Sequence, residues 1–156
     1  MDQAIARRIA QDGHVGQRDR AGDPLIEHVE RVVVAVPPEA RPTAWLHDVL
    51  ERTGMRPDEL SAHGLAPVER AALLLLTREP DESYELHVLR IAHATGPAGD
   101  LARTVKVADL RDHIRRQQEG HVAPDAPPYR WALRHMVIRG VPAAPTTSLR
   151  PLAGAG

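Results

Sequence analysis

The 156-residue chain contains no cysteine, no phenylalanine and no long apolar run. The missing thiol excludes disulfide bonds, thiolate metal sites and cysteine nucleophiles. No apolar stretch approaches the roughly 20 residues that cross a bilayer, and the first residues lack the apolar core of a signal peptide. A net charge of -1 without a long basic run speaks against a nucleic-acid binder. We therefore expect a soluble cytoplasmic protein with neither a nucleic-acid nor a membrane partner, and leave homo-oligomer formation open.

Lysine is almost absent as well. Lys106 is the only lysine among the 20 basic residues, and all the others are arginine. The arginine excess is most simply a coding bias, so the single lysine suggests that a compact ammonium group is needed at this position.

Helix start and stop signals dominate what is present, whereas strand signals are poor. Asp23 before Pro24 reads as an N-cap, the stretch from Asp81 to Ser83 reads as the cap of another helix, and Gly54 reads as a C-terminal stop. The expected helices span residues 3–11, 24–36, 42–53, 57–64, 67–76, 81–94, 99–118 and 129–139. The sequence predicts a single all-α domain of about seven or eight helices over residues 1–140, followed by a frayed tail over 141–156.

The stretch AWLHDVLERTG places a chemically reactive pair, His47 and Asp48, among apolar neighbours. Burial of a charged group there is costly unless something compensates it. On one continuous helix the two side chains are about 100° apart and lean toward one point, and Glu51 lies on the same face. This helix therefore offers an imidazole and a carboxylate to a cation, with a second carboxylate one turn away.

Two other amphipathic helices carry matching side chains. His28 lies in PLIEHVERVVVAV and Asp109 in TVKVADLRDHIR. With His47 and Asp48 they make two imidazoles and two carboxylates, which suit a borderline divalent ion such as manganese, iron or zinc with open positions for water. Taken singly, each residue also has an ordinary explanation as a hydrogen-bonded core histidine or a carboxylate paired with arginine.

The order of His, then His-Asp, then Asp on successive helices resembles the HD-domain superfamily of metal-dependent phosphohydrolases. The similarity is greatest to the hydrolase domain of RelA/SpoT-type alarmone enzymes and their small stand-alone forms, and it covers roughly residues 4–117. It rests on the stretches GHVGQRDRAGDPLIEHVERV, AWLHDVLERTG, LLLLTREPDESYELHVLRIA and VKVADLRDH. The resemblance implies an all-α HD-domain fold with a metal, usually manganese, at His28, His47, Asp48 and Asp109. It also implies removal of the diphosphate from the ribose 3′ oxygen of guanosine tetra- or pentaphosphate.

Three positions depart from the family pattern. Glu51 matches the family's acid/base carboxylate near the metal-bound water, but the next residue is Arg52 where the family commonly has aspartate. Asp19 and Arg20 replace an Arg-Lys pair of the family, so an anion stands where a cation would stack on guanine. His113 replaces an asparagine. These departures put both the alarmone-hydrolase mechanism and the specificity for guanine in question.

The remaining assignments concern cations and histidines. Arg52 is either a helix-end residue paired with Glu51 or Glu59, or a phosphate clamp in catalysis. Arg20, Lys106 and His113 are expected to bind substrate, and the i, i+4 spacing from Asp109 also lets His113 approach the metal. His14 is expected to shape its loop. The other histidines default to surface or boundary positions: His63, His87, His93, His121 and His135.

The sequence thus predicts a metal-dependent phosphohydrolase that acts on a phosphorylated nucleotide. Two alternatives remain open: a non-catalytic nucleotide sensor that has lost turnover, and a helical interaction module without metal. Neither a dinucleotide-binding glycine fingerprint nor a P-loop is present, so no organic cofactor is expected.

Overall fold

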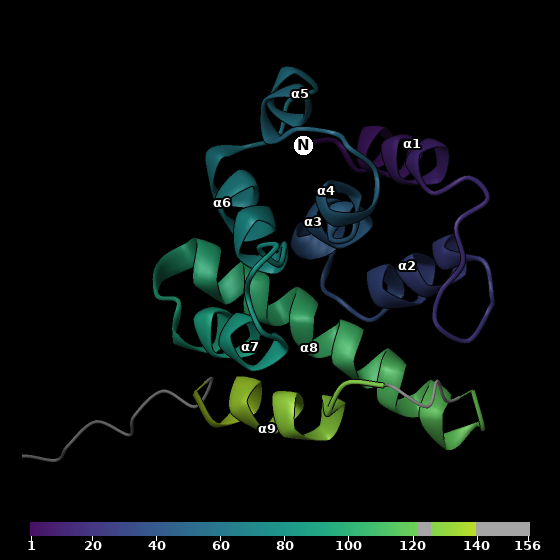
Figure 1. Ribbon diagram of the computed structural model, residues 1–156. Helices are drawn as coiled ribbons and strands as arrows, with labels where there is room; N and C mark the ends of the chain where they lie inside the picture. The colour runs from purple at the N-terminus through teal and green to yellow at the C-terminus, as the bar shows by residue number, and fades with distance from the viewer. Residues whose placement is uncertain (122–125, 140–156) are drawn as a thin grey trace, which may run out of the picture.

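The computed structural model describes residues 1–121 and 126–139, and this part of the chain is all-α, as predicted (Figure 1). Its only β-type contact is an isolated bridge between Arg18 and Pro24. The predicted tail over 141–156 lies outside the described residues. The elements are α1 (Gln3–Gly13), α2 (Leu25–Val34), the 3-10 turn η1 (Pro38–Ala40), α3 (Arg41–Leu46), α4 (Val49–Arg52), α5 (Pro57–Ala62), α6 (Pro67–Leu76), α7 (Tyr84–His93), α8 (Gly96–Gln118) and α9 (Tyr129–Arg139).

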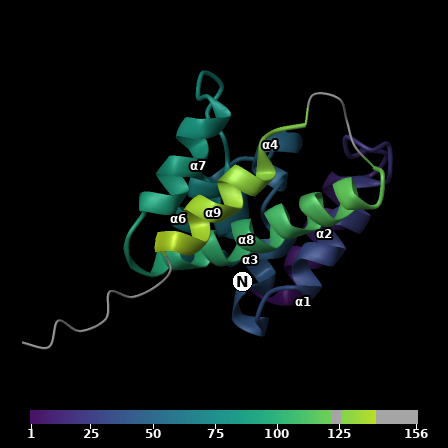
Figure 2. The same ribbon diagram turned by 90° about the horizontal axis from the view of Figure 1, so that it is seen from below.

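The long helix α8 is the axis on which the other elements pack. It contacts α2, α3, α6, α7 and α9, while α1 covers α3. Figures 1 and 2 show α9 on the opposite side of α8 from α3. The buried side of α8 begins with small and apolar residues such as Ala102 and Val105 and becomes polar at Asp109 and Asp112. One helix therefore supplies part of the core and, further along, carboxylates for a site.

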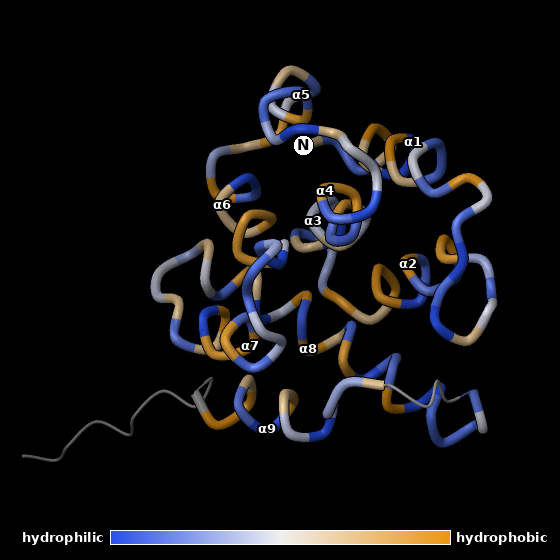
Figure 3. Tube along the Cα trace, viewed as in Figure 1, coloured by the Kyte–Doolittle hydropathy of each residue, from blue (hydrophilic) through white to orange (hydrophobic). Residues whose placement is uncertain are grey.

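The apolar core fixes the three elements that later carry this site. Val29 of α2, Leu46 of α3 and Val105 of α8 are all fully buried. In Figure 3 the apolar stretches of α2, α3 and α6 gather around the middle of the bundle. Each such side chain contributes about 1.5–3 kcal/mol on burial, so the apolar core helps to hold these helices in their relative positions.

The helix predicted over 42–53 is divided in two, which corrects the sequence interpretation. α3 ends at Leu46, α4 begins at Val49, and His47 and Asp48 form the turn between them. Asp48 has φ -100° and ψ -8°, at the edge of the helical region and close to the bridge region. The Nδ1 atom of His47 lies 2.8 Å from the carbonyl oxygen of Ala44, which an uninterrupted helix would use for its own amide bond. The orientation of the His47 and Asp48 side chains is therefore set by the turn and not by the spacing of residues along one helix.

The start of the second helix is also different from the prediction. Asp23 is not its N-cap: Pro24 takes that position and makes no side-chain cap. The carboxylate of Asp23 instead pairs with Arg116 of α8, and so ties the loop before α2 to the end of α8. At Asp23 the ion pair with a distant helix therefore replaces the local cap that the sequence suggested.

Two other boundary predictions are confirmed. Ser83 caps α7, because its Oγ accepts a hydrogen bond of 3.2 Å from the amide of Leu86. Gly54 follows the end of α4 with φ +55°, a conformation that a residue with a side chain rarely adopts.

Candidate metal centre

One cleft of about 160 Å³ brings together side chains from the whole length of the described chain. Pockets that bury a drug-sized ligand usually measure roughly 300–1,000 Å³. This cleft is smaller, so it has room for an ion and small polar groups but not for a whole drug-sized ligand. All nine residues singled out from the sequence line it: Arg20, His28, His47, Asp48, Glu51, Arg52, Lys106, Asp109 and His113.

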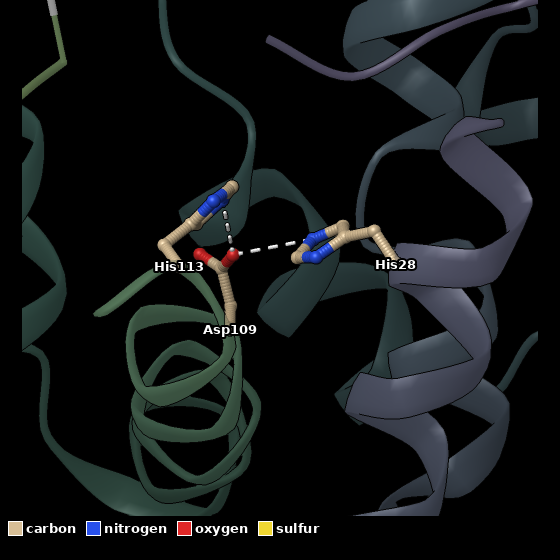
Figure 4. Close-up of side chains that lie close together, drawn as sticks. All are labelled: His28, Asp109 and His113. Atoms are coloured by element: carbon tan, nitrogen blue, oxygen red, sulfur yellow. Dashed lines mark ion pairs between the residues drawn. The ribbon is translucent and has the colours of Figure 1, made fainter. Parts of the chain in front are cut away.

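His28 and Asp109 come from α2 and α8 and meet in this cleft. Both side chains are buried. The Nε2 atom of His28 lies 3.4 Å from Oδ1 of Asp109, and the Nε2 atom of His113 lies 3.0 Å from the same oxygen. Figure 4 shows the two imidazoles approaching the carboxylate from different sides. One carboxylate oxygen therefore lies close to two ring nitrogens.

His47 and Asp48 add the donors of the α3–α4 turn. The Nδ1 atom of His47 donates to a carbonyl, which is acceptor-only, so its Nε2 atom carries the lone pair of the neutral ring. That Nε2 atom is buried, has no hydrogen-bond partner among the described residues, and lies 3.6 Å from Oδ1 of Asp48. A buried nitrogen without a partner is costly unless a cation binds there.

The donor set fits a divalent ion. Ligand atoms of His28, His47 and Asp48 all lie within 4.8 Å of one another, and so do those of His28, Asp109 and His113. Burial alone would raise the pKa of Asp109, but Lys106 and the nearby imidazoles hold it well below its usual range. The site is thus built around carboxylates that stay ionised, and these buried His and Asp groups could hold a metal ion.

Asp112 was missed by the sequence analysis. It is buried on α8, and its Oδ2 lies 2.8 Å from Nδ1 of His28. Its Oδ1 accepts hydrogen bonds from Arg31 (2.8 Å) and Arg115 (2.7 Å). A carboxylate in this place fixes the ring of His28 and turns its Nε2 atom toward Asp109. The available signal was its position one turn beyond Asp109, on the buried side of the same helix.

Replacing Asp112 with asparagine should therefore weaken metal binding without removing a ligand. We expect the affinity for a divalent ion to fall about 10- to 100-fold, because the amide no longer holds His28 as a carboxylate does. Competition with a chelating dye measures this. Glu119→Gln, which also removes a charge paired with Arg115, is the matched control and should bind as the wild type. Equal affinities in Asp112→Asn and wild type would show that Asp112 has no part in ligand positioning.

Basic side chains surround the candidate ligands. The Nζ atom of Lys106 lies 2.8 Å from Oδ2 of Asp109, which leaves Oδ1 for the two imidazoles. The Nε atom of Arg52 lies 4.0 Å from Oδ2 of Asp48. Arg52 therefore lies closest to Asp48, and not to Glu51 or Glu59, the two partners considered from the sequence. Arg20 and Arg78 complete this basic lining, of which Arg78 was not foreseen.

Glu51 lies at the edge of the cleft on α4. Its side chain is exposed, and Oε2 accepts a hydrogen bond of 3.1 Å from the backbone amide of Arg78. The bond orients the carboxylate and leaves its second oxygen available. It also connects α4 with the segment after α6.

Two tyrosines that the sequence analysis did not select also line the cleft. Tyr129, the first residue of α9, stacks on His113 with ring centroids 4.5 Å apart and an angle of 7° between the planes. Tyr84 of α7 meets Tyr129 edge to face at 6.4 Å. Because these contacts join α7, α8 and α9, no local sequence pattern could have revealed them.

The prediction of a surface or boundary position for His87 was wrong. His87 is buried beside the cleft, where Nδ1 lies 3.4 Å from Oε2 of Glu82 and 3.2 Å from Nη2 of Arg90. Arg90 holds Glu82 through two hydrogen bonds of 2.7 and 2.8 Å, and this lowers the pKa of Glu82 to about 2. Burial, together with Lys106 and Arg90, lowers the pKa of His87 to about 4.

This environment makes the stability of the fold depend on pH. The folded state disfavours the proton on His87, so the unfolded chain binds more protons between its pKa of 6.5 and the folded value of about 4. We expect the free energy of unfolding to fall by about 3 kcal/mol on this account as the pH falls through that window. Urea titrations in the presence of a chelator test this against His87→Gln, which should lack that part of the pH dependence. Parallel curves for the two proteins would contradict it.

The other histidines occupy varied positions. His14 is buried, and Nδ1 lies 3.1 Å from Oε1 of Gln17, whose amide donates to the carbonyl of Arg52 at 2.9 Å. His14 is thus linked through Gln17 to the end of α4, within the loop that it was expected to shape. The remaining four are exposed or half-buried: His63, His93, His121 and His135.

None of the helices in the described ranges is long and apolar enough to span a membrane. No family model matches the chain, and no curated protein matches its sequence.

Proposed function

We propose that the protein is a metal-dependent phosphohydrolase that acts on a phosphorylated nucleotide, as its resemblance to HD-domain enzymes suggests. One observation carries the proposal: the four candidate ligands His28, His47, Asp48 and Asp109 come from three separate elements and line one cleft. Basic side chains line the same cleft, which suits a phosphorylated ligand. A structural helical module would have no use for this combination of buried donors and cations.

The four ligands would hold a divalent ion, with manganese expected from the resemblance and iron or zinc also compatible with the donors. When bound, such an ion lowers the pKa of a coordinated water and offsets phosphate charge. Asp112 keeps His28 in the tautomer that presents Nε2 to the site. The ammonium of Lys106 keeps Asp109 oriented through Oδ2, and its other hydrogens can donate to a phosphate oxygen.

Glu51 and Arg52 take the roles closest to the chemistry. Glu51 lies at the edge of the cleft and accepts the proton of the attacking water. Arg52, with a half-exposed side chain, binds phosphate oxygens and stabilises the charge that develops as the bond to phosphorus breaks. Both residues belong to α4, directly after the turn that carries the ligands His47 and Asp48.

The loop between α1 and α2 supports the substrate class that we propose. Arg20 of this loop lines the cleft. Oδ1 of the neighbouring Asp19 accepts hydrogen bonds from the amides of Ala21 (2.9 Å) and Asp23 (3.0 Å), so this carboxylate closes its own loop. Asp19 thus stabilises its loop, and its anionic side chain cannot stack on guanine as the family's cation would. We propose a nucleotide substrate without a strict requirement for the guanine of alarmones.

A panel of nucleotides tests the proposal and separates an enzyme from a sensor. We expect the metal-loaded protein to release phosphate or diphosphate from at least one member, among 5′-triphosphates, 3′-phosphates and guanosine tetraphosphate. Arg52→Asp should lower that turnover, because an anion then faces the substrate phosphate. A sensor that lost its carboxylate predicts the opposite: an inactive wild type, and alarmone hydrolysis gained by Arg52→Asp. Glu59→Asp on α5 is the control for an exposed site.

A further inference from the structure

His113 lines the cleft, and the four-ligand description leaves its imidazole without a fixed role. It stands one turn after Asp109 on α8, and its Nε2 atom lies 3.0 Å from Oδ1 of that residue. Two side chains at i and i+4 on one helix face are a common way to hold one metal ion. The same oxygen of Asp109 also faces Nε2 of His28, at 3.4 Å (Figure 4).

The ring of His113 is held in place from both sides. On one side it stacks on His28 with centroids 4.6 Å apart and planes at 26°, and on the other it stacks on Tyr129 at 4.5 Å and 7°. Tyr129 is itself buried at the start of α9. A side chain that only followed a mobile substrate would not need such fixation, whereas a metal ligand gains from it.

The two donor groups of the cleft lie next to each other. The ligand atoms of His28, Asp109 and His113 lie within 4.8 Å of one another, and those of His28, His47 and Asp48 do so as well. His28 belongs to both groups. Because Oδ2 of Asp109 is bound by Lys106, Oδ1 is the oxygen left to point at the shared position.

We propose that His113 is a fifth protein ligand of the ion, so that the centre has three histidines and two aspartates. This inference rests on the proposed function only for the presence of the ion. Three imidazoles against two carboxylates favour iron(II) or zinc over manganese, because imidazole suits these metals and oxygen ligands suit manganese. Five protein donors also leave one position open for water or phosphate in an octahedral ion, where four donors leave two.

A spectroscopic measurement on the wild-type protein tests this directly. The chain, labelled with nitrogen-15 in its histidines, is loaded with a spin-active isotope of cadmium, and couplings between the metal and ring nitrogens are recorded. We expect couplings to Nε2 of His28, His47 and His113. Couplings to the first two alone, or no bound metal at all, would overturn the proposal.

A substitution gives a second readout that is independent of turnover. His113→Asn should weaken binding of cobalt(II) and zinc more than about tenfold. Substituting a residue that only hydrogen-bonds to a ligand already costs about 10- to 100-fold, and loss of a ligand should cost at least as much. It should also change the visible absorption of the cobalt(II) protein, because one nitrogen ligand is lost. His93→Asn makes the same change at an exposed histidine of α7 and should alter neither. Wild-type affinity and an unchanged cobalt spectrum in His113→Asn would contradict a ligand role.

The outcomes also separate this inference from the proposed function. A protein that binds an ion through three histidines but hydrolyses no nucleotide would support the fifth ligand and contradict the phosphohydrolase. A protein that hydrolyses nucleotides with only His28 and His47 coupled to the metal would support the phosphohydrolase and contradict the fifth ligand.

Discussion

Asp109→Asn is expected to remove both metal binding and turnover. Asp109 is buried, and its two oxygens face Lys106 on one side and two imidazoles on the other. Asparagine keeps the shape but presents a neutral amide, which is a much weaker ligand for a divalent ion. We expect the metal affinity to fall by more than about 100-fold. This loss exceeds the one expected when a residue that hydrogen-bonds to a ligand is substituted.

The same substitution should destabilise the metal-free protein. Without the carboxylate, the ammonium of Lys106, whose side chain is 15% exposed, loses its only ion-pair partner in the described ranges. Breaking a buried pair by removing one member typically costs roughly 3–5 kcal/mol. Asp100→Asn, on the same helix but exposed and paired with Arg103, is the matched control and should keep both the metal affinity and the stability. Chemical unfolding in chelator and metal titration together test the prediction, which fails if Asp109→Asn binds the ion as tightly as Asp100→Asn does.

Glu51→Gln should separate chemistry from binding. The glutamine oxygen can still accept the amide hydrogen of Arg78, as Oε2 of Glu51 does at 3.1 Å, so the local structure of α4 is kept. It cannot take a proton from water. We expect kcat to fall about 10²- to 10⁴-fold, the usual contribution of a general base, with little change in metal content or KM.

Glu85→Gln, at an exposed position of α7, controls for the loss of one negative charge. Its turnover should equal that of the wild type. If Glu51→Gln hydrolysed substrate at the wild-type rate, Glu51 would not be the proton acceptor. If it lost the metal as well, Glu51 would belong to the ligands instead.

The helices were predictable because their signals are local. Ser83 begins α7 and Gly54 follows α4, each by backbone chemistry that a few neighbouring residues determine. The four metal candidates could be found for a similar reason: charged side chains such as Asp109 stand out when their neighbours are apolar. The structure then gathered all of them around one cleft.

What could not be predicted depends on contacts between distant segments. Asp112 meets His28, which lies 84 residues earlier, and Tyr129 reaches His113 from another helix. The division of the helix at His47 also escaped prediction, because a ring nitrogen captures a backbone carbonyl there. His87 is a different case, because its partners Glu82 and Arg90 are local in sequence and could have been considered with it.

The most direct test of a catalytic ion in this cleft is the metal dependence of phosphate release. Wild-type protein is stripped with a chelator, dialysed, and reloaded with manganese, iron(II) or zinc before each nucleotide is offered. We predict no turnover in the stripped protein and full recovery when one ion is bound per chain. Equal turnover with and without the ion, or no release from any nucleotide with any of these ions, would contradict the account.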